Sequence, residues 1–168
     1  MKQTIALIGC GKEKANRAAP ACELYTGPLF QASRRWAEQN TDAYFIVSAK
    51  HLVIEPYTII DPYDLAMTDL PSDEQRWRAR QIESQFHMRW VEYCKFGRNS
   101  NGFTVAVDKP RVVLLASQLY LRGFYDRILA GRDKYDFEDP LRGLGIGDRL
   151  AWFKAQTRSN VNSQLELF

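Results

Sequence analysis

The chain has 168 residues, of which 45% are hydrophobic and 26% charged, and its formal net charge at pH 7 is +3. This length builds one hydrophobic core, which predicts a single domain over residues 1–168, and the mild positive charge permits a nucleic-acid partner without requiring one. The composition argues against a membrane protein, because no apolar stretch approaches the length of a span and the N-terminal apolar run is too short for a signal peptide, so we expect a cytoplasmic protein.

Three continuous apolar runs predict strands that are covered on both faces: TIALIGC (4–10), AYFIVSA (43–49) and RVVLLAS (111–117). A long loop follows the first run, and the helical spacing of apolar residues in FQASRRWAEQN predicts a helix over residues 30–40. The order strand, helix, strand implies a right-handed parallel crossover.

A long amphipathic helix is predicted over residues 71–96, and a loop or hairpin rich in Asn and Gly follows over 97–110. Another helix is predicted over residues 120–131. The glycine-rich stretch GLGIGD then leads into a final helix that begins near Gly147 or Asp148. Residues 158–168 have no clear partner and are interpreted as a C-terminal tail.

These elements together predict a three-layer α/β domain with a mainly parallel central sheet. Ligands bind outside the carboxyl ends of the strands in open sheets of this kind. The three predicted strands end near Cys10, Ser48 and Ser117. We therefore expect the loops after these strands to meet at one edge of the sheet.

The stretch VSAKHLVIEPYTIIDPYDL (47–65) gathers titratable residues just past the second strand. Lys50 and His51 follow the strand directly, and the DPYD turn holds Asp61 and Asp64 near each other around a stiffening proline. A carboxylate beside a lysine is a plain salt bridge in most proteins. The place at a strand end, and a histidine that titrates near neutral pH, favour a functional site.

The stretch GCGKEK (9–14) resembles a phosphate loop only superficially, because Glu13 stands where a Walker motif needs Ser or Thr. Gly9 and Gly11 could let backbone N–H groups approach a ligand, with Lys12 as a point charge. A tight turn with solvated lysines explains the same residues. Tyr120, after the third strand, could line the same cleft or belong to the core.

The composition does not favour a metal or a cofactor. Cys10, Cys22 and Cys94 are an odd number without framework spacing, and only His51 and His87 accompany them. No zinc constellation can be built from such a set, so we expect no metal, no cofactor and a reducing compartment.

Several motifs resemble an uncharacterised family of bacterial and phage proteins. They are CGKEK, PACELY, SAKH, PYDL and GLGIG, in the family's order and over most of the chain. Leu52 departs from the pattern, which has glycine there, so we expect the backbone after His51 to turn differently. More distantly, the chain is similar to YaaA-like proteins and to domains that accompany archaeal tRNA-guanine transglycosylases, which have a uracil-DNA glycosylase-like fold.

The distant resemblance implies a DNA glycosylase that removes a modified base from phage DNA as a defence. Such an enzyme needs a carboxylate for the sugar, a cation for the leaving base and an aromatic pocket. We expect Asp64 to be the carboxylate with Asp61 as its substitute, and Lys50 and His51 to receive the base. The residues expected to bind the base or the DNA strand are Gly9, Cys10, Gly11, Lys12, Tyr25, Phe30, Ser48, Tyr63, Ser117 and Tyr120.

Three alternatives stay open at this point. Lys50 could attack the sugar as an amine, although nothing in the sequence marks its pKa as lowered. The protein could be a non-catalytic module that binds a nucleotide or modified base. It could also be a base-transfer enzyme of modified-nucleoside metabolism.

Overall fold

The computed structural model describes residues 2–130 and 135–165. Its centre is a five-stranded sheet in the order β4-β3-β1-β8-β9, in which only β4 runs antiparallel to its neighbour. The predicted α/β fold with a mainly parallel central sheet is thus confirmed. The strands are β1 (Thr4–Gly9), β3 (Ala43–Ser48), β4 (Leu52–Ile54), β8 (Arg111–Leu115) and β9 (Asp136–Glu138).

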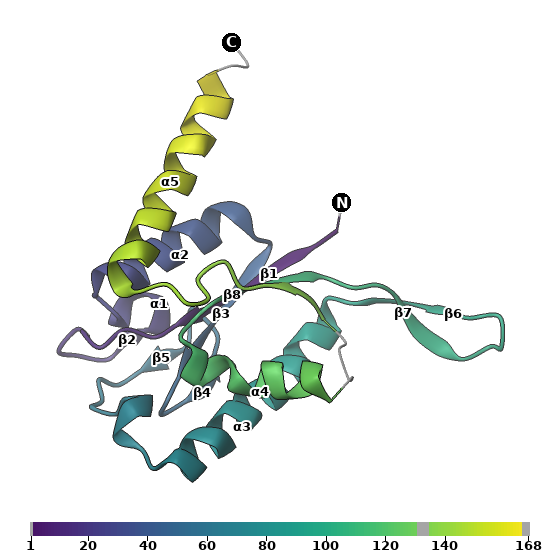
Figure 1. Cartoon of the computed structure of the whole chain (residues 1–168), viewed down its shortest axis with the longest axis horizontal. Coiled ribbons are helices and arrows are strands. Elements are labelled where there is room, and N and C mark those ends of the chain that lie inside the picture. The colour runs from purple at the N-terminus through teal and green to yellow at the C-terminus, as the bar shows by residue number, and fades with distance from the viewer. Residues whose placement is uncertain (1, 131–134, 166–168) are drawn as a thin grey trace.

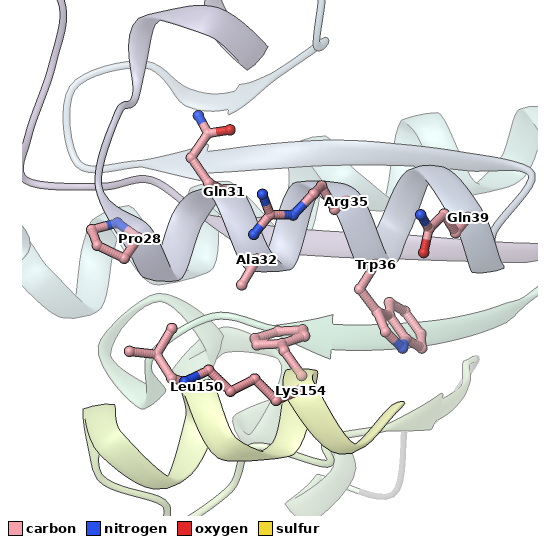
Figure 2. Close-up of a pocket in the computed structure, with 9 residues that line it drawn as sticks. Pro28, Gln31, Ala32, Arg35, Trp36, Gln39, Leu150 and Lys154 are labelled. Carbon is pink, nitrogen blue, oxygen red and sulfur yellow. The ribbon is translucent and has the colours of Figure 1, made fainter. Parts of the chain in front are cut away.

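Helices cover both faces of the sheet (Figure 1). They are α1 (Ala21–Leu24), α2 (Pro28–Asn40), α3 (Ser72–Glu92), α4 (Gln118–Leu129) and α5 (Ile146–Leu165). The side chains of β1 alternate between two cores, because successive residues of a strand point to opposite faces. Ile5 and Leu7 pack with α3 and α4, whereas Ala6 and Ile8 pack with α1, α2 and α5. Figure 2 shows α5 lying along α2 on the second face.

Two small antiparallel pairs complete the fold. β2 (Ala19–Pro20) pairs with β5 (Ile59–Ile60) and thereby joins the loop after β1 to the loop after β4. β6 (Lys95–Arg98) and β7 (Thr104–Asp108) form a hairpin that projects from the body of the domain (Figure 1). The short β2, β4, β5 and β9 were not predicted, because two or three residues carry too little periodicity to distinguish a strand from a loop.

The observed helix ends differ from the predicted ones by more than two residues at two places. α3 ends at Glu92, and Lys95 already belongs to β6, so the predicted end at residue 96 is four residues too late. α5 continues to Leu165 through most of the stretch interpreted as a tail, whereas residues 166–168 lie outside the described part. Within the described residues, no helix has the length and apolar character that a membrane crossing needs.

Candidate functional site

The three main strands end side by side. Gly9 is in register with Val47, and Ile8 with Leu115, so the loops after β1, β3 and β8 leave the same edge of the sheet. The N–H of Cys10 donates to the carbonyl of Val47 at 2.9 Å, which holds the first loop against β3. The edge therefore has the geometry in which parallel sheets bind ligands.

A cavity of about 310 Å³, called here the edge cavity, opens at this edge. The first loop, the first turns of α2 and α5 and the start of α4 enclose it. Seven of the residues predicted to bind line it: Gly9, Cys10, Gly11, Lys12, Phe30, Ser117 and Tyr120. Its other lining residues include Glu13, Ser33 and Arg149. The walls thus combine aromatic rings with two cations and one carboxylate.

Gly9 has a packing role at the start of the first loop. A Cβ on Gly9 would lie 3.3 Å from the Cα of Ala116, whereas a Cβ on Gly11 would lie at an ordinary contact distance, 3.6 Å, from the Cβ of Tyr25. Gly9 therefore lets the chain after β1 pass close to the end of β8. The loop then turns back, because the Ala15 N–H donates to the Leu24 carbonyl at 2.8 Å.

A cluster of hydroxyls backs the edge cavity. The Tyr63 hydroxyl lies 2.6 Å from Ser48 Oγ and 2.8 Å from the Tyr25 hydroxyl. Ser48 Oγ also accepts the N–H groups of Lys50 and His51, each at 3.1 Å, and so shapes the turn after β3. The ring of Tyr25 lies 5.0 Å from that of Phe30, a wall of the edge cavity. We call Tyr25, Ser48 and Tyr63 the tyrosine cluster.

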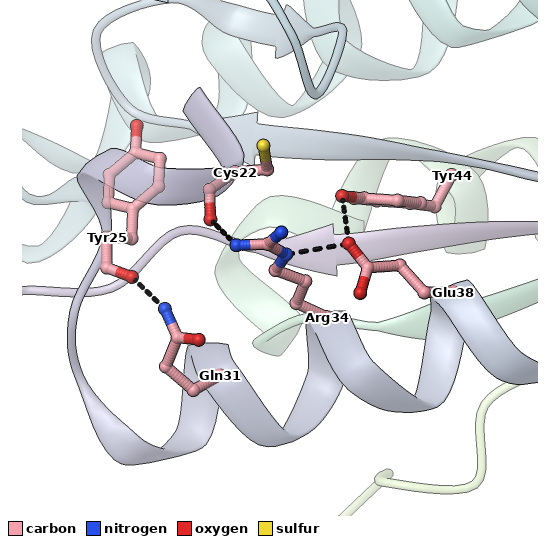
Figure 3. Close-up of polar contacts among 6 residues, drawn as sticks. All are labelled: Cys22, Tyr25, Gln31, Arg34, Glu38 and Tyr44. Carbon is pink, nitrogen blue, oxygen red and sulfur yellow. Dashed lines mark hydrogen bonds and ion pairs between the residues drawn. The ribbon is translucent and has the colours of Figure 1, made fainter. Parts of the chain in front are cut away.

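Side chains of α2 hold Tyr25 in place (Figure 3). Gln31 Nε2 donates to the Tyr25 carbonyl at 2.7 Å, and Arg34 Nη1 donates to the Cys22 carbonyl at 2.7 Å. Arg34 is itself fixed by Glu38, its Nε lying 2.7 Å from the carboxylate. These contacts attach α1 to α2 and direct the Tyr25 ring toward Tyr63.

Burial keeps the site's phenols protonated. It raises the pKa of Tyr25 to about 12, and it raises the pKa of Tyr63 and of Tyr120 as well, with the nearby Cys10 thiol acting in the same direction. Cys10 Sγ lies 3.5 Å from the Tyr120 hydroxyl. The three hydroxyls are therefore available as hydrogen-bond donors at neutral pH.

Two ammonium groups lie over the tyrosine cluster. Lys14 Nζ is 4.4 Å from the Tyr63 ring centroid and 5.8 Å from that of Tyr25. Lys50 Nζ is 5.3 Å from the Tyr63 ring centroid. All three distances fall in the range of cation–π attraction, so Tyr63 fixes two positive charges near the edge of the sheet.

His51 packs behind Tyr63, with ring centroids 5.2 Å apart. Burial, and then the charge of Lys50, lower the pKa of His51 below its usual value, so the imidazole is neutral at pH 7. Its Nε2 is buried without a hydrogen-bond partner among the described residues. His51 lines a different hollow, of about 330 Å³, together with Glu55 and Arg89.

Asp61 and Asp64 are exposed, and neither lines the edge cavity. Lys50 is also exposed and does not line it. The structure thus gathers the predicted binding residues around the edge cavity and the tyrosine cluster, while the predicted carboxylates lie outside this cavity. The catalytic roles of Asp61, Asp64, Lys50 and His51 stay predictions.

Sequence reasoning missed two charged residues of the cavity. Glu13 was considered only as a departure from a Walker motif, yet it lies between Lys12 and the tyrosine-facing Lys14 in CGKEK. Arg149 belongs to the first turns of α5, directly after the GLGIGD stretch. Its Nε donates to the Leu144 carbonyl at 2.9 Å. No group of three His, Cys, Asp or Glu side chains suited to a metal occurs among the described residues.

The fold and the site define a mainly parallel α/β protein with an aromatic, charged cavity at the carboxyl edge of its sheet. The chain belongs to a family of unknown function (DUF6884), whose model matches residues 5–155. The match includes the edge cavity, the tyrosine cluster and the start of α5. No curated protein and no solved structure matches the chain.

Proposed function

We propose that the protein is a DNA glycosylase that binds a modified base in the edge cavity and hydrolyses its N-glycosidic bond. The observation that carries this proposal is the edge cavity itself. It places aromatic walls, two cations and a carboxylate in one hollow at the ligand-binding edge of a parallel sheet. An extruded base needs such walls to stack on and charged groups at its edge.

The reaction builds positive charge on the sugar and negative charge on the departing base, so it needs a carboxylate and a cation. Glu13 is the carboxylate that lines the cavity, and it therefore takes precedence over Asp64 and Asp61 for activating water or stabilising the sugar. Lys12 and Arg149 would stabilise the leaving base or a neighbouring phosphate. Phe30 and Tyr120 would contact the ring of the base.

A non-catalytic module that binds a nucleotide or modified base is the second candidate. The exposed positions of Asp61 and Asp64 outside the edge cavity favour it, because these were the carboxylates that sequence reasoning selected. Such a module would use the same aromatic walls and cations. It would not need Glu13.

The test is a mass-spectrometric search for bases that the protein frees from a panel of modified phage DNAs, with binding to the same DNAs measured in parallel. We expect release by the native chain and at least a hundredfold loss in Glu13→Gln, since a carboxylate in glycoside hydrolysis is required for the rate rather than for binding. Glu23→Gln is the matched control, because Glu23 is exposed on α1 and does not line the cavity.

Each outcome has a definite meaning. Loss of release in Asp64→Asn with full activity in Glu13→Gln would assign the carboxylate role to Asp64. Binding of the DNAs without release from any of them would reject the glycosylase and support the binding module. Absence of both binding and release would reject the two candidates together.

A further inference from the structure

We propose that a groove between α2 and α5 binds the nucleotides that flank the base, so that a single-stranded nucleic acid leaves the edge cavity along these two helices. This inference rests on the proposed function only for what occupies the edge cavity. The groove itself is argued from its own shape, charge and aromatic content.

The groove has a volume of about 450 Å³ and lies where α5 packs along α2 (Figure 2). In Figure 2, Leu150 points from α5 toward α2, and the side chain of Lys154 runs along α5 toward Leu150. Its lining residues on α2 run from Pro28 to Gln39, which corresponds to about 16 Å at 1.5 Å per residue. That length accommodates a short run of nucleotides and exceeds what one base needs.

The groove continues the edge cavity. Pro28 and Leu150 line both hollows, so the two share a wall on each helix. Pro28 opens α2 at the cavity, and α2 then leads away from the edge. A ligand with its base in the edge cavity would therefore have its neighbouring nucleotides directed into the groove.

The charges of this surface suit a polyanion. Arg35 and Lys154 line the groove, and Lys12 and Arg149 line the cavity. The groove lining contains no acidic side chain of the described residues, and neither Arg35 nor Lys154 forms an ion pair with any of them. The neighbouring Arg34, by contrast, is neutralised by Glu38. Arg35 and Lys154 are therefore free to contact phosphates.

Trp36 provides a surface for base stacking within the groove. Its ring is half-buried and packs against Trp152 at 5.6 Å between centroids, which fixes its orientation. The amide of Gln39 lies in the same lining and can donate to a base edge. A cationic groove with an aromatic ring for stacking is typical of sites for unpaired strands, because a duplex hides the faces of its bases. The occupant we infer is therefore single-stranded.

The experiment measures fluorescence anisotropy of a labelled single strand of about 12 nucleotides, as DNA and as RNA, over a range of salt concentrations. We expect Arg35→Gln combined with Lys154→Gln to weaken binding about tenfold. The slope of log affinity against log salt should fall by about 1.4, since each phosphate contact to a single strand contributes about 0.7. Comparison of the two strands shows which nucleic acid is preferred.

Arg76→Gln combined with Arg80→Gln is the matched control, because both arginines are exposed on α3 and line neither hollow. This variant removes the same charge and should keep the native affinity and slope. Equal weakening by the two double variants, or weakening by neither, would overturn the inference. So would a change of oligomeric state in the groove variant, because the groove would then be an interface between copies.

The outcome is separable from that of the proposed function. Base release with native affinity in the groove variant would reject the groove and leave the glycosylase standing. Groove-dependent strand binding without base release would reject the glycosylase and support the groove. Both double variants should unfold at the same temperature as the native chain in a thermal melt, which verifies that they are folded.

Discussion

Leu52 shows how one residue can carry the strain of a site. It follows the turn that bears Lys50 and His51 as the first residue of β4, and its φ of 63° is the only positive φ of a non-glycine residue in the described part of the chain. This is the left-handed conformation that glycine adopts freely and that costs other residues about 1–2 kcal/mol. Leu52 thus takes the conformation that a glycine would favour at this position, which gives no support to the expected different turn after His51.

We expect Leu52→Gly to be more stable than Leu52→Ala by about 1 kcal/mol, although both variants lose the packing of the leucine side chain. The comparison isolates the backbone strain, because the two variants differ only by one methyl group. Urea unfolding gives the two free energies. At Val53, which lies in β4, the order should be reversed, with glycine less stable than alanine by about 1 kcal/mol. The same order at both positions would contradict the strain.

Tyr63 is the residue that positions most of its neighbours within the site. Its hydroxyl joins Ser48 of β3 to Tyr25, the residue after α1, and its ring receives two lysine ammonium groups. Residues from three distant parts of the sequence are thus positioned by one side chain. No periodicity in the stretch DPYD marks Tyr63 for this role.

At the scale of elements, the contact between α3 and α4 depends on one glycine. A Cβ on Gly123 would lie 2.4 Å from the carbonyl oxygen of Ala79 and 2.9 Å from its carbonyl carbon. Both atoms are backbone, so no side-chain rotation can relieve the clash. The two helices therefore approach each other more closely than any residue with a side chain would allow.

Gly123→Ala should destabilise the fold by about 2–3 kcal/mol, because the helices must separate and the core beneath them must repack. Gly147→Ala in α5 is the control: no atom lies within 4 Å of its added Cβ, and its φ is not positive. That substitution should be neutral or stabilise by up to about 1 kcal/mol, since alanine is the better helix former. Chemical denaturation measures both, and an equal loss at the two glycines would reject the close contact.

At the scale of the whole molecule, buried phenols make stability depend on alkaline pH. Burial raises the pKa of Tyr25 and that of Tyr125 to about 12, and it raises the pKa of Tyr44, Tyr63 and Tyr120. In the unfolded chain a phenol ionises near pH 10. The folded chain then holds protons that the unfolded chain releases, so stability is fully present below about pH 10 and falls as pH rises toward 12.

For Tyr25, which is fully buried, a shift of about two units corresponds to roughly 3 kcal/mol of stability lost across this range. We expect Tyr25→Phe to be less stable than the native chain near neutral pH, because Tyr63 loses a hydrogen-bond partner. Between about pH 10 and 12, Tyr25→Phe should lose roughly 3 kcal/mol less stability than the native chain loses, because it has no phenol at position 25 to ionise. Tyr57→Phe, at a tyrosine that is 77% exposed, should leave the pH dependence unchanged. Urea unfolding at several pH values tests this, and equal pH slopes in the three proteins would contradict it.

The sequence by itself determined the strands and long helices that build the sheet, because apolar runs and helical spacing report burial directly. It also placed Cys10, Ser48 and Ser117 at one edge, since parallel strands that follow buried runs end on the same side. The glycine-rich stretch before α5 likewise marked a segment whose first turns line the edge cavity.

Only the tertiary structure decided which charged residues share a hollow. Sequence reasoning selected Asp64 as the carboxylate and passed over Glu13, but of the two only Glu13 lines the edge cavity. The pairing of β2 with β5 and the packing of α5 along α2 join segments that are far apart in the chain. Such contacts depend on the shapes of both partners, so no local pattern of residues encodes them. The direction of a loop side chain, such as that of Glu13 or Asp64, likewise depends on the segments that pack against the loop.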